Sequence, residues 1–363
     1  MRRVMIMLWV AGLASLGTAA RAQSLPAAEL DAVAGGAGWV NTASEHIAIR
    51  LRALHGSVGR YLEGLALHAP ESREADRAWA AVDAGRGFGP ANALRLWTAP
   101  YLFSAVRSGA NGYSHDAGGA LVGLDKAFGC LTVGIAADFM FGDYDQRARR
   151  MQNEYTGLSG MVFTRFSHGQ LEIELDAGLG RYWGNTHRIA PDATRIRSDM
   201  NLHEYFAALS AAYRIHVGYD WVLAPSLGVQ YIRAKTPAFS ENTHAYALHY
   251  GKQSHNWVRT PLFLTATRSF RGFGHLVTPY MRAGATPEWH RDTPVRRVAR
   301  AGGPGGAVSD EISGARAVHW YGQAGAGFTA KLGTRTDFNM GYDFEFSRRY
   351  RNNIFNIGLG FSF

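Results

Sequence analysis

The residues most capable of chemistry are fourteen histidines, one cysteine and scattered serines and carboxylates. No histidine lies in an HExxH pattern or in a close pair with the spacing of metal ligands. The segment Gly157-Leu158-Ser159-Gly160 falls short of a nucleophile elbow, which also requires a strand–turn–helix context. Cys130 is the single cysteine, which excludes a disulfide framework and a Cys-rich zinc site. The sequence therefore predicts no catalytic residue, no metal site and no cofactor.

The composition points away from an ordinary soluble enzyme. The 363-residue chain is 47% hydrophobic, 12% aromatic and only 18% charged, with 43 glycines. This charged fraction is below the roughly 25% typical of soluble domains, yet the mean hydropathy is only -0.16. Beyond residue 22 there is no run of about 18 apolar residues, so we expect no membrane-spanning helix. The combination is typical of a chain that presents apolar groups to lipid and polar groups to water in alternation.

The N-terminus has the three parts of a secretory signal peptide. Arg2 and Arg3 form the positive start, residues 4–16 the apolar core, and Ala20-Arg21-Ala22 the small-x-small cleavage site. We therefore expect residues 1–22 to be removed and the mature chain to be exported. The formal charge is +9 and nearly all of it is arginine. For an exported protein this favours phosphorylated lipid head groups as acidic partners, and no nucleic-acid-binding motif occurs.

Residues 23–93 differ from the rest of the chain. Apolar residues recur at three- and four-residue steps over about residues 40–68, which predicts a helix. The glycine-rich stretch at 85–90 then breaks any helix and predicts a linker.

From Leu94 onward the apolar period changes to two, which is the period of a β-strand. The last segment shows it most clearly, because Phe355, Ile357 and Leu359 alternate with asparagine, glycine and serine. We expect twelve strands, at about residues 95–107, 117–127, 130–142, 154–167, 170–183, 201–216, 220–233, 255–270, 274–290, 316–331, 334–347 and 352–363. These segments reach the roughly nine to eleven residues that a tilted strand needs to cross the hydrocarbon core.

The connections between these strands alternate between short and long. Short turns such as Phe128-Gly129 and His168-Gly169 alternate with longer connections at 108–116, 143–153, 184–200, 234–254 and 291–315. Outer-membrane barrels show this asymmetry, with short periplasmic turns and longer external loops. Closure into a barrel also satisfies every backbone hydrogen bond, as lipid requires. The predicted fold class is an all-β membrane protein, a twelve-stranded antiparallel outer-membrane β-barrel with an N-terminal α-helix in the lumen.

Several motifs in this order resemble the C-terminal barrel domain of autotransporters, the type V secretion family. They are Leu96-Trp97-Thr98-Ala99-Pro100-Tyr101, Gly112-Tyr113-Ser114-His115-Asp116 and the closing strand with its terminal aromatic. The resemblance implies a twelve-stranded barrel threaded by a helix, which helps to carry an N-terminal passenger to the cell surface. The chain departs from the family in having no long repetitive passenger before the helix. The expected organisation is a signal peptide at 1–22, a helical segment and linker at 23–93, and a barrel at 94–363.

The strand pattern also predicts which charged residues face the lumen. The inward acids are expected to be Glu172, Glu174, Asp176, Asp337, Asp343 and Glu345, joined by Asp125, Asp138 and Glu288, with Arg259, Arg282 and Arg335 as inward cations. One hypothesis is that these acids form an electrostatic seat for the helix that bears Arg50, Arg52 and Arg60. The alternative is a water-filled lumen lined by solvated charge.

Three further assignments concern the ends of the strands. The resemblance implies that Ile357, Leu359, Phe361 and Phe363 form the signal for the barrel-assembly machinery. We expect Trp97, Trp183, Trp221, Trp257, Trp289 and Trp320 to form the interfacial girdles. The loop at 291–315, which contains a glycine-rich stretch and a basic first half, is predicted to be mobile and solvated, or to touch surface polyanions or a host receptor.

The resulting functional prediction is a barrel of the autotransporter translocator type in the outer membrane of a Gram-negative bacterium. It anchors or exports an N-terminal segment at the cell surface, is monomeric and is not an enzyme. Its expected partners are outer-membrane lipids and the export and barrel-assembly machinery. The alternatives are a standalone adhesin-like surface protein, a pore, and a barrel hydrolase with a serine and a histidine on its strands.

Overall fold

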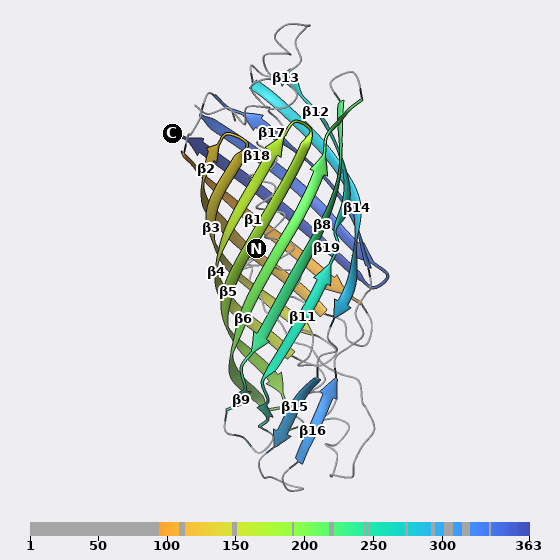
Figure 1. The fold of residues 1–363 in the computed structure, drawn as a ribbon. Helices are drawn as coiled ribbons and strands as arrows, with labels where there is room; N and C mark the ends of the chain where they lie inside the picture. Colours follow the sequence, from red (N-terminus) through yellow and green to blue (C-terminus); the bar gives the residue numbers. More distant parts are fainter. Residues whose placement is uncertain are drawn as a thin grey trace, which may run out of the picture.

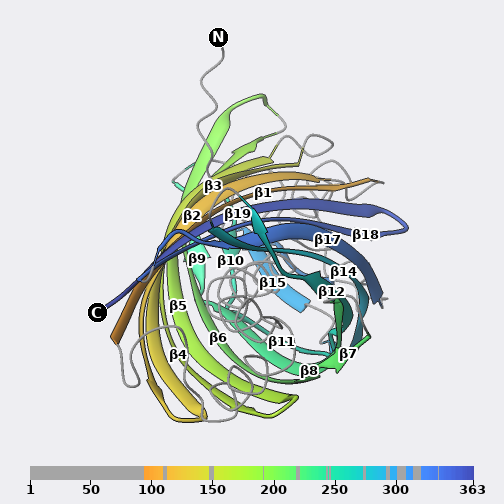
Figure 2. The same cartoon turned by 90° about the horizontal axis from the view of Figure 1, so that it is seen from above.

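The computed structural model describes residues 94–363, apart from 109–112, 147–150, 191, 218–220, 243, 245–246, 273–274, 292–294, 301–307, 314–319 and 334. The described chain forms one closed antiparallel β-barrel and a small second sheet (Figures 1 and 2). No helix long and apolar enough to cross a bilayer occurs in this part of the chain. Residues 1–93, and with them the predicted signal peptide and helix, lie outside the described residues.

Twelve strands make up the barrel when β11 and β12 are counted as one interrupted strand, as predicted. Consecutive strands are hydrogen-bonded neighbours, and β1 pairs with β19 to close the ring. The strands are β1 (Leu94–Arg107), β2 (Tyr113–Phe128), β3 (Leu131–Gln146), β4 (Met151–His168), β5 (Leu171–Ile189), β6 (Arg195–Tyr213), β8 (Trp221–Thr236), β11 (Gln253–Arg259), β12 (Leu262–Arg268), β14 (His275–Arg291), β17 (Trp320–Lys331), β18 (Thr336–Ser347) and β19 (Tyr350–Ser362). The short strands β7 (Ile215–His216) and β13 (Phe270–Gly272) extend the ladder near the turns.

The sequence forms a barrel because side chains on a strand alternate between its two faces. In β18, Asp337, Asn339 and Asp343 are buried, whereas Met340 and Tyr342 between them are exposed. An outward apolar face suits lipid, and an inward polar face finds partners inside the ring. The same alternation repeats around the barrel, with exposed large apolar residues on most of its strands.

One predicted strand is broken in the structure. The segment predicted at 255–270 divides at Thr260-Pro261, because proline has no N–H to give to the ladder. The break is bridged by hydrogen bonds from Gly228 N to Pro261 O (2.9 Å) and from Thr260 N to Pro287 O (3.0 Å). Both halves still pair with β8 and β14, so the barrel remains closed.

Two of the predicted short turns, Phe128-Gly129 and His168-Gly169, lie one residue later in the structure, as two-residue turns at Gly129-Cys130 and Gly169-Gln170. Both glycines have positive φ, 62° and 55°, which such hairpins require and glycine adopts at no steric cost. At the other end of the barrel the strands are longer than predicted. Because β5 and β6 reach Ile189 and Arg195, most of the predicted connection at 184–200 is paired strand.

A second sheet has the order β16-β15-β10-β9 and replaces part of two predicted loops. Its strands are β9 (Phe239–Ser240), β10 (His249–Tyr250), β15 (Val295–Arg300) and β16 (Val308–Ser313). The loop predicted at 291–315 therefore contains two strands, and β15 pairs with both β10 and β16. This sheet lies at the end of the barrel away from the C-terminus, and the view along the barrel shows β10 and β15 within the ring (Figures 1 and 2).

Candidate functional site

The inner face of the barrel carries buried arginines that are joined to carboxylates on other strands. Arg165 and Arg188 are among the largest fully buried side chains of the protein. Because burying an unpaired charge is very costly, each such side chain needs an oppositely charged partner within hydrogen-bond reach. The pairs come from strands that alternate inward polar residues with outward apolar ones, so the fold itself gathers the charges.

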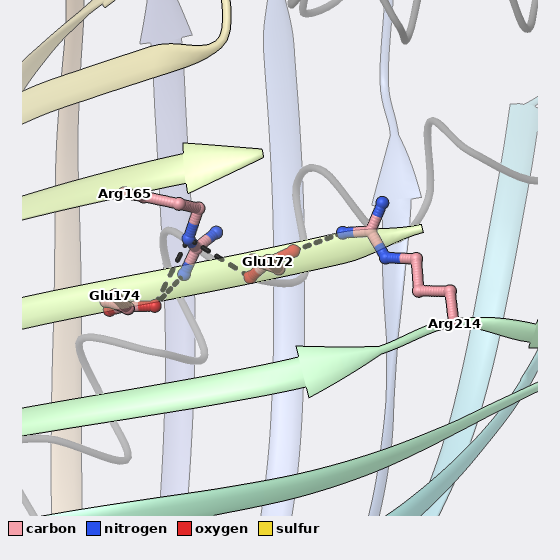
Figure 3. Close-up of polar contacts among 4 residues, drawn as sticks. All are labelled: Arg165, Glu172, Glu174 and Arg214. Carbon is pink, nitrogen blue, oxygen red and sulfur yellow. Dashed lines mark hydrogen bonds and ion pairs between the residues drawn. The ribbon is translucent and has the colours of Figure 1, made fainter. Parts of the chain in front are cut away.

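The most extended group spans β4, β5 and the residue that follows β6 (Figure 3). Arg165 Nε lies 3.1 Å from Glu172 Oε1 and 3.1 Å from Glu174 Oε2. A second bond joins Arg165 Nη2 to Glu174, and Arg214 Nη2 pairs with the other oxygen of Glu172. Positive and negative groups therefore alternate along the inner wall, and the guanidinium of Arg165 is shared between two carboxylates.

A second group crosses the seam where the first and last strands meet. Arg95 on β1 contacts Asp337 on β18 at 2.8 Å and Asp125 on β2 at 3.5 Å. The bond to Asp337 passes over β19 at Gly360, where an added Cβ would lie 2.6 Å from Asp337 Oδ1. A side chain at this position would displace the ion pair, and the two contacts of Arg95 join β1, β2 and β18 across the closure.

Two further pairs and an amide network complete the inner wall. Arg282 Nε on β14 donates to Asp343 Oδ1 on β18 at 2.7 Å, and Arg259 Nε on β11 donates to Glu288 Oε1 on β14 at 2.6 Å. Glu345 accepts a hydrogen bond from Gln323 Nε2 at 2.6 Å. Each of these contacts joins side chains on two different strands, and the bonds to Asp343 and Glu288 are charge-assisted.

Glu241, beside the second sheet, is also buried and anchors this end of the molecule. Its carboxylate accepts hydrogen bonds from Arg188 Nε (2.8 Å), Arg188 Nη2 (2.6 Å), Leu248 N (2.9 Å) and Tyr250 Oη (3.0 Å). Since Arg188 belongs to β5, this cluster fastens the β9–β10 hairpin to the barrel wall.

The structure places all six predicted lumen acids on inward positions of β5 and β18. Glu174, Asp176, Asp337, Asp343 and Glu345 are buried, and Glu172 is half-buried. The assignment of Arg335 to the lumen is wrong, because this residue is exposed in the turn between β17 and β18. The alternation that places side chains on one face holds only within β18, which begins at Thr336, one residue after Arg335. Ala20, Ala22, Arg50, Arg52 and Arg60 lie outside the described residues.

The tryptophan girdle is only partly as predicted. Trp183, Trp221, Trp289 and Trp320 are exposed on the outer surface, but Trp97 and Trp257 are each 1% exposed and point inward. Trp97 belongs to an inner aromatic layer whose rings lie against glycines of neighbouring strands. An added Cβ at Gly123 would lie 2.1 Å from Trp97 Cζ2. A tryptophan on a strand can therefore face either the membrane or the lumen. The inward Trp97 fits because Gly123 on the neighbouring strand leaves room for its ring.

Sequence reasoning missed the inward arginines Arg95, Arg165 and Arg188. They share a face with large apolar residues such as Phe163, which made both faces of β4 look apolar. The partner acids carried a signal, because an inward row of Glu172 and Glu174 predicts cations on the adjacent strands.

The inner wall is a polar lining whose charged side chains are held by ion pairs between strands. Gly157-Leu158-Ser159-Gly160 lies within β4, so the strand–turn–helix context of a nucleophile elbow is not present there. Within the described residues no group of three or more His, Cys, Asp or Glu side chains could hold a metal ion. At the C-terminus, Phe361 and Phe363 point outward and are exposed, and Phe363 N bonds to Leu94 O at 2.9 Å.

A closed antiparallel barrel with an apolar outer wall and a charged inner wall defines a protein of the bacterial outer membrane. The family described as the autotransporter beta-domain matches residues 101–343, which is more than half of the chain. The chain therefore belongs to this family, and it is an outer-membrane barrel of the translocator type that serves the export of a passenger. No curated protein matches the sequence.

Two solved structures share the fold. The beta domain of the Bordetella autotransporter BrkA is 20% identical with a TM-score of 0.59, covering 75% of this chain and 100% of that one. The translocator domain of the autotransporter NalP from Neisseria meningitidis is 14% identical with a TM-score of 0.60, covering 79% of this chain and 94% of that one. Both extend the family assignment to the three-dimensional fold.

Proposed function

We propose that this barrel anchors and exports its own N-terminal segment, residues 23–93, with the arginines of that segment facing the inner acids. The observation that carries the proposal is an excess of negative charge inside. Among the described residues, ten carboxylates are buried against five arginines (Arg95, Arg165, Arg188, Arg214 and Arg259). The ten carboxylates are Asp125, Asp138, Glu174, Asp176, Glu204, Glu241, Glu288, Asp337, Asp343 and Glu345.

With the half-buried Glu172 and Arg282 included, eleven acids and six arginines belong to the described inner wall, so its acids exceed its arginines by five. The predicted helix at 40–68 would offset part of this excess, because it carries Arg50, Arg52 and Arg60 against Glu45 and Glu63. A carboxylate has about four acceptor positions, so an acid already bonded to a wall arginine can accept another donor. The segment would therefore share the carboxylates with the wall rather than displace its arginines.

Single-channel conductance of the refolded protein in a planar bilayer tests this proposal. We expect residues 23–363 to give a closed barrel, and removal of residues 23–93 to open it. The triple variant Arg50→Gln, Arg52→Gln, Arg60→Gln should raise the conductance, because the segment loses its electrostatic attraction to the wall. The matched control changes Arg73, Arg77 and Arg86 to Gln, which lie beyond the predicted helix and should leave the conductance unchanged.

An open full-length barrel would contradict the proposal, as would equal conductance of the two triple variants. Either result would favour the alternative that the protein is a pore. Surface display is tested separately with an epitope placed after Ala22, which should bind antibody on intact cells. Binding only after lysis would refute the anchoring of the segment at the surface.

The proposal includes assembly as a monomeric barrel through its last strand. Ile357, Leu359 and Phe361 lie on the outward face of β19, and the exposed Phe363 follows the end of the strand. Deletion of Phe363 should abolish insertion into the outer membrane, whereas Phe346→Ala on the neighbouring β18, also an exposed phenylalanine, should not. Normal insertion without Phe363 would contradict this role.

We also propose that the barrel works without catalysis. Support comes from Ser159, which lies in the middle of β4 and faces inward. The purified protein should not hydrolyse short-chain p-nitrophenyl esters. Turnover that disappears in Ser159→Ala would contradict this and favour the hydrolase alternative.

A further inference from the structure

Basic side chains gather on the outer wall of β5, β6 and β8. Arg181 on β5 pairs in register with His203 on β6, and His203 pairs with Lys235 on β8. Arg233, two positions from Lys235, is the register partner of Tyr205. Arg181 and Lys235 are exposed, and His203 and Arg233 are half-buried. Arg181, His203, Arg233 and Lys235 therefore form one contiguous group, which we call the outer basic cluster.

The outer basic cluster lies at the edge of the apolar band. Arg181 is about ten residues along β5 from Leu171, at the short-turn end. With a rise of about 3.3 Å per residue and a tilt of about 45°, this distance corresponds to about 23 Å along the barrel axis, close to the roughly 25 Å of a lipid-facing band. The outward residues between them include Leu175 and Leu179, which are 51% and 61% exposed.

The level of the cluster is also marked by aromatic residues. Trp183 and Tyr205 are exposed beside it, and the Arg181 guanidinium lies 5.3 Å from the Trp183 ring centre. Lys235 Nζ likewise lies 5.3 Å from the ring centre of Tyr205. Exposed aromatics of this kind form the girdle at the membrane interface, where lipid head groups lie. The cluster thus faces head groups at the end of the barrel away from the C-terminus.

Within the described residues, no carboxylate pairs with Arg181, Arg233 or Lys235. The recorded polar contact of Arg181 is from its Nη2 to Asn201 Oδ1 at 3.4 Å, and the buried Nε of Arg233 has no hydrogen-bond partner. The nearest outward acids by register are Glu154 and Asp199, which both pair with Asn185. Asn185 lies four residues beyond Arg181 along β5, further from the apolar band. Like charges placed side by side destabilise a sheet, so this group calls for an anion from outside the chain.

We propose that the outer basic cluster binds a phosphorylated lipid of the leaflet it faces, with the phosphates on Arg181, His203 and Lys235. A guanidinium and an ammonium at the head-group level recognise phosphate through charge-assisted hydrogen bonds. The acyl chains would lie along Leu179, Leu209 and Val229, which are exposed on the same three strands. A lipid offers both the anion and the chains. The proposal depends on the outer-membrane location of the barrel and not on the export of a segment.

The test is a titration of the refolded mature chain, residues 23–363, in non-ionic detergent with lipid A, followed by native mass spectrometry. Lipid A carrying both phosphates and lipid A without phosphates are compared. We expect preferential binding of the phosphorylated form. The double variant Arg181→Gln, Lys235→Gln should weaken that binding by about 10- to 30-fold, since each cation near a membrane surface contributes about one factor of five.

The matched control is Lys126→Gln, Arg351→Gln, which removes two other outward cations. Like Lys235, Lys126 has its Nζ near an aromatic ring, 5.4 Å from the centre of Phe128. Arg351 is exposed and is the second residue of β19. This control should bind within about twofold of the wild type, and so should Arg181→Lys, Lys235→Arg, which keeps both charges. Equal losses in the two glutamine variants would overturn the proposal. So would equal binding of the phosphate-free lipid, or displacement of the lipid by millimolar inorganic phosphate.

Discussion

Arginines on the two faces of the barrel wall have opposite surroundings. On the inner face, Arg95 and Arg165 each contact two carboxylates within 3.5 Å, and both side chains are at most 5% exposed. On the outer face, Arg181 lies against an indole ring and an amide, and Arg233 pairs with no carboxylate within the described residues. The same residue type therefore obtains its counter-charge from the protein on one face and, by our inference, from the membrane on the other.

This difference follows from what each face can offer. The inner face has fixed neighbours, so a charge there must find its partner among residues that the strand register brings close. The outer face is surrounded by lipid, whose phosphates are available only at the two interfaces. Inner cations can therefore be placed at any height along the barrel, whereas outer cations are restricted to the interface.

The largest test of this comparison is Arg165→Met. Glu172 and Glu174 would lose a shared guanidinium that is 1% exposed, so we expect a loss of about 3–5 kcal/mol in the free energy of unfolding. Arg181→Met on the outer face should cost less than about 1 kcal/mol, because the residue lies near the interface. Urea unfolding in lipid vesicles, followed by tryptophan fluorescence, gives both values. Losses of equal size would mean that the two faces do not differ as argued.

Glycines on the two faces give a second test of intermediate size. A Cβ at Gly123 would overlap the inward Trp97 ring, at 2.1 Å from Cζ2, whereas a Cβ at Gly160 meets nothing within 4 Å. We expect Gly123→Ala to lower the unfolding free energy by about 1–3 kcal/mol, because a packed ring must move. Gly160→Ala should be neutral or slightly stabilising, since alanine restricts the unfolded chain. A neutral Gly123→Ala would show that the inner aromatic layer is loosely packed.

Much of the barrel could be predicted from the sequence because its information is local. Alternation of apolar and polar residues is visible within one strand, and β18 and β19 show it without interruption. Glycines at the two-residue turns marked where strands end. The number of strands and the inward acids of β5 and β18 follow from these local signals alone.

The rest depends on residues that are distant in sequence. The Arg95–Asp337 bond joins positions 242 residues apart, and no local pattern indicates it. In β4, Phe163 and Arg165 share the inner face, so the polar face was hidden by its aromatic residues. The second sheet could not be predicted because β9 and β10 have two residues each, and β10 joins the sheet through β15, about 50 residues further along the chain.

The smallest test concerns acids on the outer face, beyond the apolar band. Asp143 on β3 pairs in register with Asp116 on β2 and with Glu154 on β4. Burial of the carboxyl raises the pKa of Asp143, and the negative charges of Glu154, Asp145 and Asp116 raise it further, against a hydrogen bond from Gln152. Inner acids have arginines nearby, whereas the charged neighbours of Asp143 are other carboxylates.

A raised pKa means that the folded state holds the proton more tightly than the unfolded chain does. Stability from this group is therefore fully present below the unfolded pKa, near 4, and is lost as the pH rises through the higher folded pKa. Asp143→Asn removes the charge, so it should stabilise the barrel at pH 7 by less than about 1 kcal/mol and have no effect at acid pH.

Asp192 provides the control with the opposite sign, because the backbone N–H of Thr194 lowers the pKa of this exposed acid. Its contribution is present above the unfolded pKa and lost as the pH falls, so Asp192→Asn should destabilise the protein at pH 7. Urea midpoints of both variants between pH 4 and 8 give the comparison. If Asp143→Asn were less stable than the wild type at pH 7, the carboxylate would have a partner on the outer face, and the contrast between the two faces would not extend to acids.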